Sequence, residues 1–345
     1  MSSSGQTILL ILAVAVAFLA FGLLCTPENL VRLEILEKSL HSESELIRRG
    51  ARVEIAVART VAFVAAAGLF LLALLWPRIE CSARYHAFMG RKRESLRQHR
   101  LFRGKVLTPS MATMMAAIGL MFLWIVTADS FLTRAQLRFV HREDGILQTA
   151  SALFLLGAAV ISVRIALRLG RSRPEFYMHL FLGFLFFVMC GEEISWGQRY
   201  FDFATPDFLA TINAQGETNF HNMYGYFFDH LFILAFFLWG VAVPLLDHFS
   251  RFFRQLFSAT GLPVPSAGLA VAMLVISGMQ SVIVYKFINP LPTLRLPEAR
   301  ELLSALAFVV LMLEVWVLVG RQLPKRQQEN ASKWGPGTPD NSRRR

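Results

Sequence analysis

The segment YMHLFLGFLFFVMCGEEISWGQR, residues 177–199, contains both features that decide the fold of this chain. Its first half is an apolar run, and a membrane-spanning helix needs about 20 mostly apolar residues. Its second half adds two carboxylates, Glu192 and Glu193, at the end of that run. Ionisable groups beside a membrane segment are costly, so several together usually line a pathway or a site. The segment therefore predicts a membrane helix that ends at a polar site.

Apolar windows of this kind recur along the whole chain, which is 54% hydrophobic and has a mean hydropathy of +0.47. The alternating pattern of a membrane barrel does not recur, and helices satisfy their own backbone hydrogen bonds in lipid. We therefore predict an all-α, polytopic helical bundle with about eight transmembrane helices in a single domain, residues 1–321. The expected spans are 7–25, 55–76, 111–128, 146–168, 177–198, 222–246, 266–288 and 301–320.

Basic residues predict the orientation of these spans. The formal net charge is +11, and nine Lys and Arg lie between Arg78 and Lys105, with more in the tail, residues 322–345. Cytoplasmic loops carry an excess of Lys and Arg, and eight spans put both basic regions on one side. Both termini are therefore expected in the cytoplasm and the 199–221 loop outside. The tail is polar and rich in Pro, Gly and Arg, so it is expected to be disordered.

The same charges indicate the partners of the chain. Basic clusters beside membrane spans attract anionic lipid headgroups. Membrane lipids are therefore the expected partners, with anionic headgroups at the basic cytoplasmic loops, and binding to nucleic acid is not expected.

Two loops carry helix-start patterns of a capping residue, a proline and an acid. Thr26-Pro27-Glu28 opens the 26–54 loop, and apolar residues follow it at helical spacing. Thr205-Pro206-Asp207 repeats the pattern in the 199–221 loop. Each predicts an amphipathic helix at the outer surface.

The candidate site consists of polar residues at the outer ends of the fifth and sixth spans. If the fifth helix continues to residue 198, Glu192 shares a face with Ser195, Trp196 and Arg199, and Glu193 points about 100° away. Carboxylates and histidines in a low-dielectric pocket act as general acids and bases or hold a metal that activates water. The expected catalytic residues are Glu192, Glu193, Glu217, His221 and Asp229.

Glu217 and His221 also form the candidate metal pair, because residues four apart lie on one helical face. A carboxylate with a neutral imidazole suits zinc or iron, so a divalent metal is a candidate cofactor that the sequence leaves open. Asn219, Asn222, Tyr226 and Asp229 would form a polar stripe on the other face of the same helix. The further expected pocket residues are Asn219, Asn222, Tyr226, His230, Gln280, Arg199 and Asp144.

Two charges lie toward the inner side of the predicted spans. Arg164 falls in the fourth span and Glu314 in the eighth, each about one-third of the bilayer from the cytoplasmic face. Because an unpaired charge at that depth is expensive, we predict a structural ion pair between these two residues.

Three motifs are specific as strings: HREDG at 141–145, GEEISWGQR at 191–199 and NxQGExNxHN at 213–222. On these motifs the chain resembles a group of bacterial multi-pass membrane proteins without assigned activity. The resemblance covers about 80 residues, from His141 to Asn222, and implies a bacterial inner membrane. It implies no chemistry.

Three functions fit these observations. The first is a membrane-embedded hydrolase or transferase that acts on a lipid or lipid-linked substrate at the outer leaflet. The second is a proton-coupled transporter or channel that uses the same carboxylates as a relay. A transporter also needs polar groups on the cytoplasmic half, which is nearly apolar in the sequence. The third is a non-catalytic assembly protein whose polar cluster is a structural hydrogen-bond network.

Overall fold

The computed structural model describes residues 3–33, 37–90, 108–142, 145–213, 216–220, 222–223, 227–279, 294 and 296–333. Helices make up most of this part of the chain, and its only β pairing is an isolated bridge between Asn213 and Met223. Seven helices of the described residues are long and apolar enough to cross a membrane. The predicted all-α polytopic bundle is confirmed.

Seven of the eight predicted spans coincide with these long helices. The corresponding elements are α1 (Ser3–Leu24), α4 (Glu45–Glu80), α6 (Pro109–Phe131), α8 (Ile146–Leu169), α9 (Pro174–Glu193), the run from α12 (Phe227–Phe237) through α13 (Val243–Phe249), and α17 (Leu296–Lys333). The predicted span 266–288 contains the shorter apolar helix α15 (Ala267–Gly278), and its residues from 280 onward lie outside the described part.

The chain divides into two compact units by its internal contacts. The single domain expected from the sequence stays a prediction. Unit 1 comprises Met1–Lys92 and Gly191–Ala235, and unit 2 comprises Arg93–Cys190 and Phe236–Arg345. Two of the boundaries between the units fall inside helices. The boundary after Cys190 lies in α9, and the boundary after Ala235 lies in α12.

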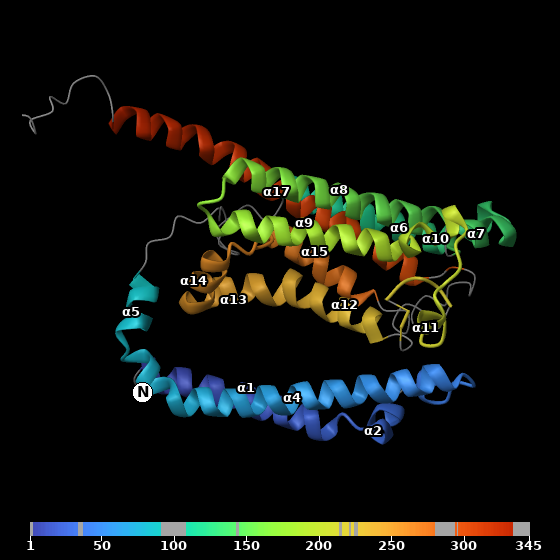
Figure 1. Cartoon of the computed structure of the whole chain (residues 1–345), viewed down its shortest axis with the longest axis horizontal. Helices are drawn as coiled ribbons and strands as arrows, with labels where there is room; N and C mark the ends of the chain where they lie inside the picture. Colours follow the sequence, from blue (N-terminus) through green and yellow to red (C-terminus); the bar gives the residue numbers. More distant parts are fainter. Residues whose placement is uncertain are drawn as a thin grey trace, which may run out of the picture. The chain divides into compact units, whose positions relative to one another are not determined.

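In unit 1, α1 and α4 pack along each other (Figure 1). Their contact is close at Gly22, where an added Cβ would lie 2.8 Å from the Phe63 ring. Arg59 Nε donates to the Gly22 carbonyl oxygen at 3.2 Å across the same contact. A glycine leaves room for the neighbouring helix to come close, so Gly22 allows α1 and α4 to pack tightly at this point.

The first predicted helix start is confirmed. Thr26 caps α2 (Pro27–Arg32), and its Oγ1 accepts a hydrogen bond from Asn29 N at 3.3 Å. The expected amphipathic helix is split, since a second short helix, α3 (Glu37–Leu40), follows after residues outside the described part. The second start pattern gives only the short α11 (Asp207–Ala210), and Thr205 does not cap it. The Thr205 hydroxyl instead donates to the Gly216 carbonyl oxygen.

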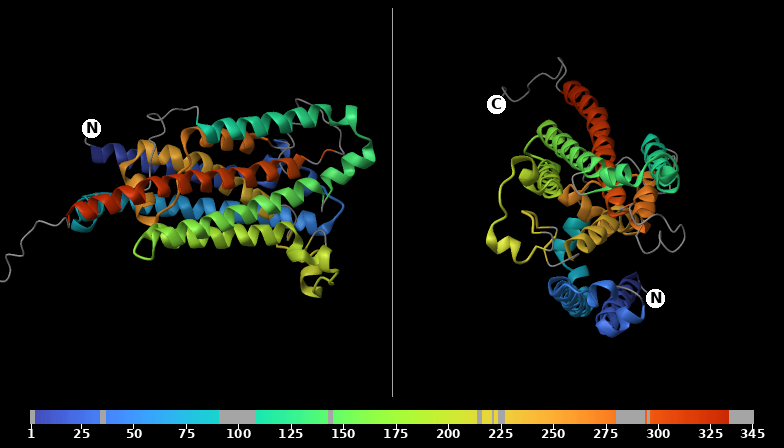
Figure 2. Two further views of the ribbon diagram at one scale, coloured as in Figure 1. Left: turned by 90° about the horizontal axis from the view of Figure 1, so that it is seen from above. Right: turned by 90° about the vertical axis from the view of Figure 1, so that its right-hand side faces the viewer.

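In unit 2, α8 and α17 form the most extensive contact, and α6, α9 and α15 belong to the same bundle (Figures 1 and 2). Small buried side chains such as Ala158 on α8 and Ala307 on α17 permit this packing. An aromatic group fills the bundle between α9, α12, α17 and the π-helical turn Leu238–Ala242. Its members are Phe186, Phe236, Trp239 and Phe308.

Several predicted boundaries differ from the structure, and three of them concern the site and the tail. The fifth helix ends at Glu193 rather than at 198, because left-handed backbone follows it. The sixth begins at Phe227 rather than at 222. The last helix, α17, continues to Lys333, so the tail is helical well beyond the expected boundary at 321. Gln, Glu, Lys and Arg make up most of residues 321–333 and are good helix formers, although the segment also contains Pro324. Residues 334–345 lie outside the described part.

The predicted ion pair between Arg164 and Glu314 does not form among the described residues. The Glu314 carboxylate accepts hydrogen bonds from Ser266 N at 3.2 Å and from Ser266 Oγ at 2.5 Å, at the start of α15. Arg164 is exposed. The helices that the prediction joined do pack together, and a charged contact between them is made by Arg168, whose guanidinium lies 3.5 Å from the ring centroid of Trp316. A helix N-terminus stabilises a carboxylate as a cation does, which accounts for the difference.

Candidate functional site

A left-handed turn ends the fifth span and builds the candidate site. Ser195, Trp196 and Gly197 have φ values of 47°, 55° and 81°, so three consecutive residues lie in a region that favours glycine. Each non-glycine residue in that conformation costs on the order of 1–3 kcal/mol. Backbone strain of this size persists only where surrounding contacts enforce it. The turn is therefore held by its neighbours.

Glu192 provides two of the contacts that hold the turn. Its Oε1 accepts a hydrogen bond from Trp196 Nε1 at 2.7 Å, and its Oε2 accepts one from the backbone N–H of Phe220. The Trp196 ring lies back against Gly191, where an added Cβ would be 2.8 Å from the indole. One carboxylate thus fixes the turn and ties it to the segment that precedes the sixth span.

At the centre of the site, Ser195 lies between a carboxylate and an amide. Its Oγ donates to Glu217 Oε2 at 2.8 Å and accepts from Asn219 Nδ2 at 2.9 Å. Asn219 Nδ2 also donates to Glu217 Oε2 at 2.8 Å. Ser195 and Asn219 are each only 1% exposed. A hydroxyl, a carboxylate within hydrogen-bond reach and a third group that orients the carboxylate are the arrangement of an activated nucleophile.

Further amide groups hold this triplet in place. Asn213 Nδ2 donates to Asn219 Oδ1 at 2.8 Å, and Asn213 Oδ1 accepts from Glu217 N at 3.2 Å. Gln198 joins the two ends of the loop, since its Nε2 donates to Thr205 Oγ1 and its Oε1 accepts from Thr218 N at 2.7 Å. A connected and partly buried network of this kind fixes the side chains that belong to it.

The structure brings together three of the residues that the sequence selected: Glu192, Glu217 and Asn219. Asn222 joins them through its backbone, whose N–H lies 3.4 Å from Asn219 Oδ1. Glu193, the last residue of α9, is half-buried.

Asp229 and His230 lie in the first turn of α12. His230 Nδ1 lies 2.7 Å from Glu54 Oε1, so the histidine contacts α4 of the same unit. Glu54 was outside the predicted set. That Asp229 shares one cavity with Glu192 or Glu193 stays a prediction.

Several predicted site residues lie outside the described part of the chain: His221, Tyr226, Gln280, Asp144 and the side chain of Arg199. The proposed metal pair of Glu217 and His221 is therefore untested. Among the described residues, no group of three or more His, Cys, Asp and Glu side chains is arranged to hold a metal ion.

The helical faces on which the sequence argument relied are not present. Glu217 and Asn219 lie in irregular backbone, and α12 begins only at Phe227. The polar stripe expected to run from Asn219 down one helix to Asp229 is therefore wrong as a helical stripe. Glu192 does contact Trp196 as predicted, but through the left-handed turn and not along a continued helix.

The loop around the site exposes many aromatic side chains. Phe201 is 80% exposed, and other aromatic residues of the same loop are exposed as well. Amphipathic aromatic residues gather where a membrane meets water, so the loop has the composition of an interfacial surface. The exposed aromatics of this loop are Trp196, Tyr200, Phe201, Phe203, Phe208 and Phe220.

Ser195, Asn213 and Gln198 are the functional candidates that sequence reasoning missed. All three belong to the motifs at 191–199 and 213–222, but none is ionisable, and the expected catalytic residues were all chosen as ionisable groups. The signal that was available is Gly197 in S-W-G, because a glycine at the end of a helical pattern marks left-handed backbone.

Comparison with known protein families, curated proteins and solved structures finds no match to this chain.

Proposed function

We propose that the chain is a membrane-embedded hydrolase or transferase that acts on a lipid or lipid-linked substrate. The observation that carries the proposal is the hydrogen bond of 2.8 Å from Ser195 Oγ to Glu217 Oε2, in a turn whose backbone is strained. Strained backbone clusters at active sites, where the geometry serves the reaction. A structural serine in a loop needs no such conformation.

The chemistry assigned to this pair is nucleophilic acyl or phosphoryl transfer. Ser195 Oγ attacks the carbonyl carbon or phosphorus of an ester, and its proton passes to Glu217. The leaving alcohol takes that proton, and a water or a second alcohol then releases the group from Ser195. Asn219 Nδ2 donates a hydrogen bond to each of the two reacting side chains and so holds them next to each other.

The substrate class follows from the surface around the pair. Exposed aromatic side chains such as Phe201 and Phe208 favour immersion of this loop in the headgroup region. The ester bonds of membrane lipids lie at that depth. A reactive pair there acts on lipids or on groups attached to lipid carriers.

Two other functions each have an observation in their favour. Ser195 and Asn219 are almost fully buried, which favours a purely structural network in an assembly protein. A cavity whose lining includes Glu175 and His179 lies near the start of α9, in the half that the sequence predicted to be nearly apolar. That cavity favours a transporter. Neither observation explains the strained turn.

The proposed site belongs on the outer face of a bacterial inner membrane, with both termini in the cytoplasm, because the basic bias of residues 78–105 and of the tail favours that orientation. A periplasm-specific reporter inserted after Thr211 is expected to be active, and the same reporter fused at the C-terminus inactive. The reverse pattern would contradict the outward orientation.

The function itself is tested by the lipid composition of cells that lack the chain. We expect one class of lipid or lipid-linked intermediate to accumulate, and wild-type protein supplied in trans to restore the normal pool. Asp207→Asn, which neutralises an exposed acid of the same loop, serves as the matched control and should restore it equally. An unchanged lipid profile in the deleted cells would contradict the proposal.

A further inference from the structure

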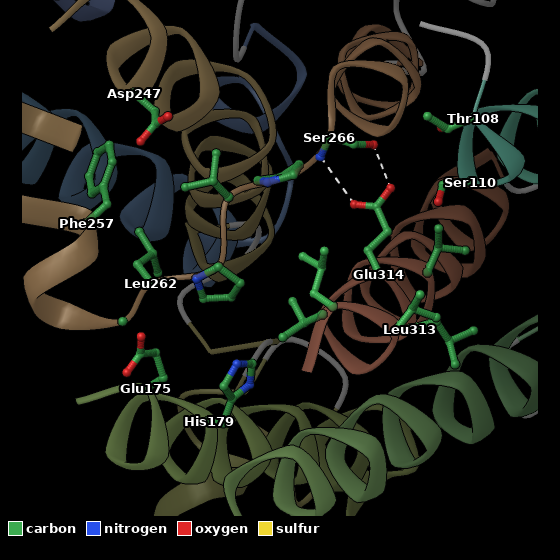
Figure 3. Close-up of a pocket in the computed structure, with 18 of the residues that line it drawn as sticks. Thr108, Ser110, Glu175, His179, Asp247, Phe257, Leu262, Ser266, Leu313 and Glu314 are labelled. Atoms are coloured by element: carbon green, nitrogen blue, oxygen red, sulfur yellow. Dashed lines mark hydrogen bonds between the residues drawn. The ribbon is translucent and has the colours of Figure 1, made fainter. Parts of the chain in front are cut away.

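Unit 2 contains a cavity of about 410 Å³ that the sequence did not predict. It lies among the first turns of α6 and α9, the middle of α17, and the segment that joins α14 (Arg251–Thr260) to α15 (Figure 3). Cavities of a few hundred cubic ångströms with apolar walls and a few polar groups are the usual form of small-molecule sites. The walls include Leu262, Pro263, Val310 and Leu313.

The charges that line this cavity are mainly negative. Glu175, Asp247 and Glu314 contribute three carboxylates, while Arg321 is the one Lys or Arg among the lining residues. The three carboxylates come from different elements and lie around the same space (Figure 3). Glu314 is already bonded to Ser266, so Glu175 is the acid of interest for a ligand.

Glu175 is the group that points to a ligand. It is 7% exposed, and its carboxylate makes no hydrogen bond or ion pair with the described residues. As a first-turn residue of α9 it gains from the helix dipole, but that gain is usually below about 1 kcal/mol and does not replace water around a buried charge. Ser258 Oγ, which lines the same cavity, is also buried without a hydrogen-bond partner.

His179 adds an acceptor to the cavity. Ser162 Oγ donates its single proton to the His179 carbonyl oxygen at 2.8 Å, and it lies 3.1 Å from His179 Nδ1. A serine hydroxyl has one proton to donate, so Nδ1 must carry the proton of that second bond. Nε2 of the neutral ring is then the acceptor. The ring lies toward the cavity beside Glu175 (Figure 3).

We propose that this cavity binds a small organic cation with N–H donors, namely a primary ammonium group on a short apolar chain. Its N–H groups match Glu175 and His179 Nε2, and its hydrocarbon part matches the apolar wall. A bare metal ion fits less well, because no three His, Cys, Asp or Glu side chains of the described residues are arranged to coordinate one. The proposal does not depend on the chemistry at Ser195, which lies in the other unit.

Two sources provide this chemistry: a free amine and the ethanolamine headgroup of a membrane lipid. The experiment separates them with the full-length chain in detergent and in lipid nanodiscs. Ethanolamine and spermidine are expected to raise the melting temperature in detergent if the ligand is a free amine, whereas phosphatidylethanolamine nanodiscs are expected to do so if it is the lipid. Choline has the charge of ethanolamine, and phosphatidylcholine has the charge of phosphatidylethanolamine, but neither has N–H donors, so they serve as the negative controls.

Variants identify the cavity as the binding site. Glu175→Gln is expected to weaken amine binding at least about tenfold, the usual effect of losing a hydrogen bond to a charged group. Glu45→Gln, which removes an exposed first-turn acid of α4, should leave binding unchanged. Asp247→Asn provides a second test if Glu175→Gln does not fold. The proposal is overturned if neither amines nor phosphatidylethanolamine exceed their choline controls, or if binding survives in both cavity variants.

Discussion

Cells that carry Glu217→Gln in place of the wild-type protein are expected to accumulate the same lipid as cells that lack the chain. The substituted amide preserves the shape of the side chain and can still accept the hydrogen bonds from Ser195 and Asn219. It cannot take the Ser195 proton. Because general-base catalysis contributes about 10²–10⁴-fold in rate, turnover should fall by that factor. The protein should remain at wild-type abundance in the membrane, as measured by immunoblot.

Ser195→Ala is expected to give the same lipid accumulation, since it removes the nucleophile. The backbone strain at residue 195 should remain, because alanine is no better suited than serine to the left-handed conformation. The structural alternative makes the opposite prediction for both variants. If the network only holds the loop, the variants should lose thermal stability and abundance, and each remaining molecule should work normally. A normal rate per molecule in Glu217→Gln would exclude Glu217 as the base.

Gly261→Ala is expected to produce a large loss of stability in unit 2. Gly261 has a φ of 75°, and an added Cβ would lie 2.6 Å from Glu175 Cα and 2.7 Å from Glu175 N. The left-handed conformation and the backbone clash together should cost about 2–4 kcal/mol. Thermal unfolding of the purified chain in detergent measures the effect.

The matched control for that variant is Gly216→Ala. Gly216 has a similar φ of 68° but open space around the position of a Cβ. Gly216→Ala should therefore lower the stability only by the cost of placing alanine in left-handed backbone, about 1–2 kcal/mol. Equal destabilisation by the two substitutions would show that the close approach of Gly261 to α9 does not matter.

The membrane helices could be predicted because each one carries its own signal. An apolar run of sufficient length must be helical in lipid, whatever it packs against. The start of a helix was also predictable where the residue just before it caps it, as Thr26 caps α2. The pairing of α8 with α17 was predicted from Arg164 and Glu314, and the helices do pack together although these two residues do not meet.

The site was predicted only in outline, because its geometry depends on contacts between distant segments. Ser195 meets Glu217 across 22 residues, and Glu192 reaches Phe220 across 28. Neither separation leaves a periodic pattern in the sequence. Helical periodicity was also extended through 195–197, where the backbone is left-handed. The cavity of unit 2 was missed for a related reason, since its acids Glu175, Asp247 and Glu314 come from three separate helices.

Covalent labelling tests most directly whether Ser195 and Glu217 form a reactive pair. The membrane-embedded chain is treated with an alkyl fluorophosphonate, which modifies activated serines, and the modified residue is located by mass spectrometry. We expect phosphonylation at Ser195 in the wild-type protein and at least about a hundredfold slower labelling in Glu217→Gln, since the base that activates the hydroxyl is lost. Ser195 that stays unmodified while an added serine hydrolase is labelled in the same vesicles, or labelling that is equal in the two proteins, would contradict the account.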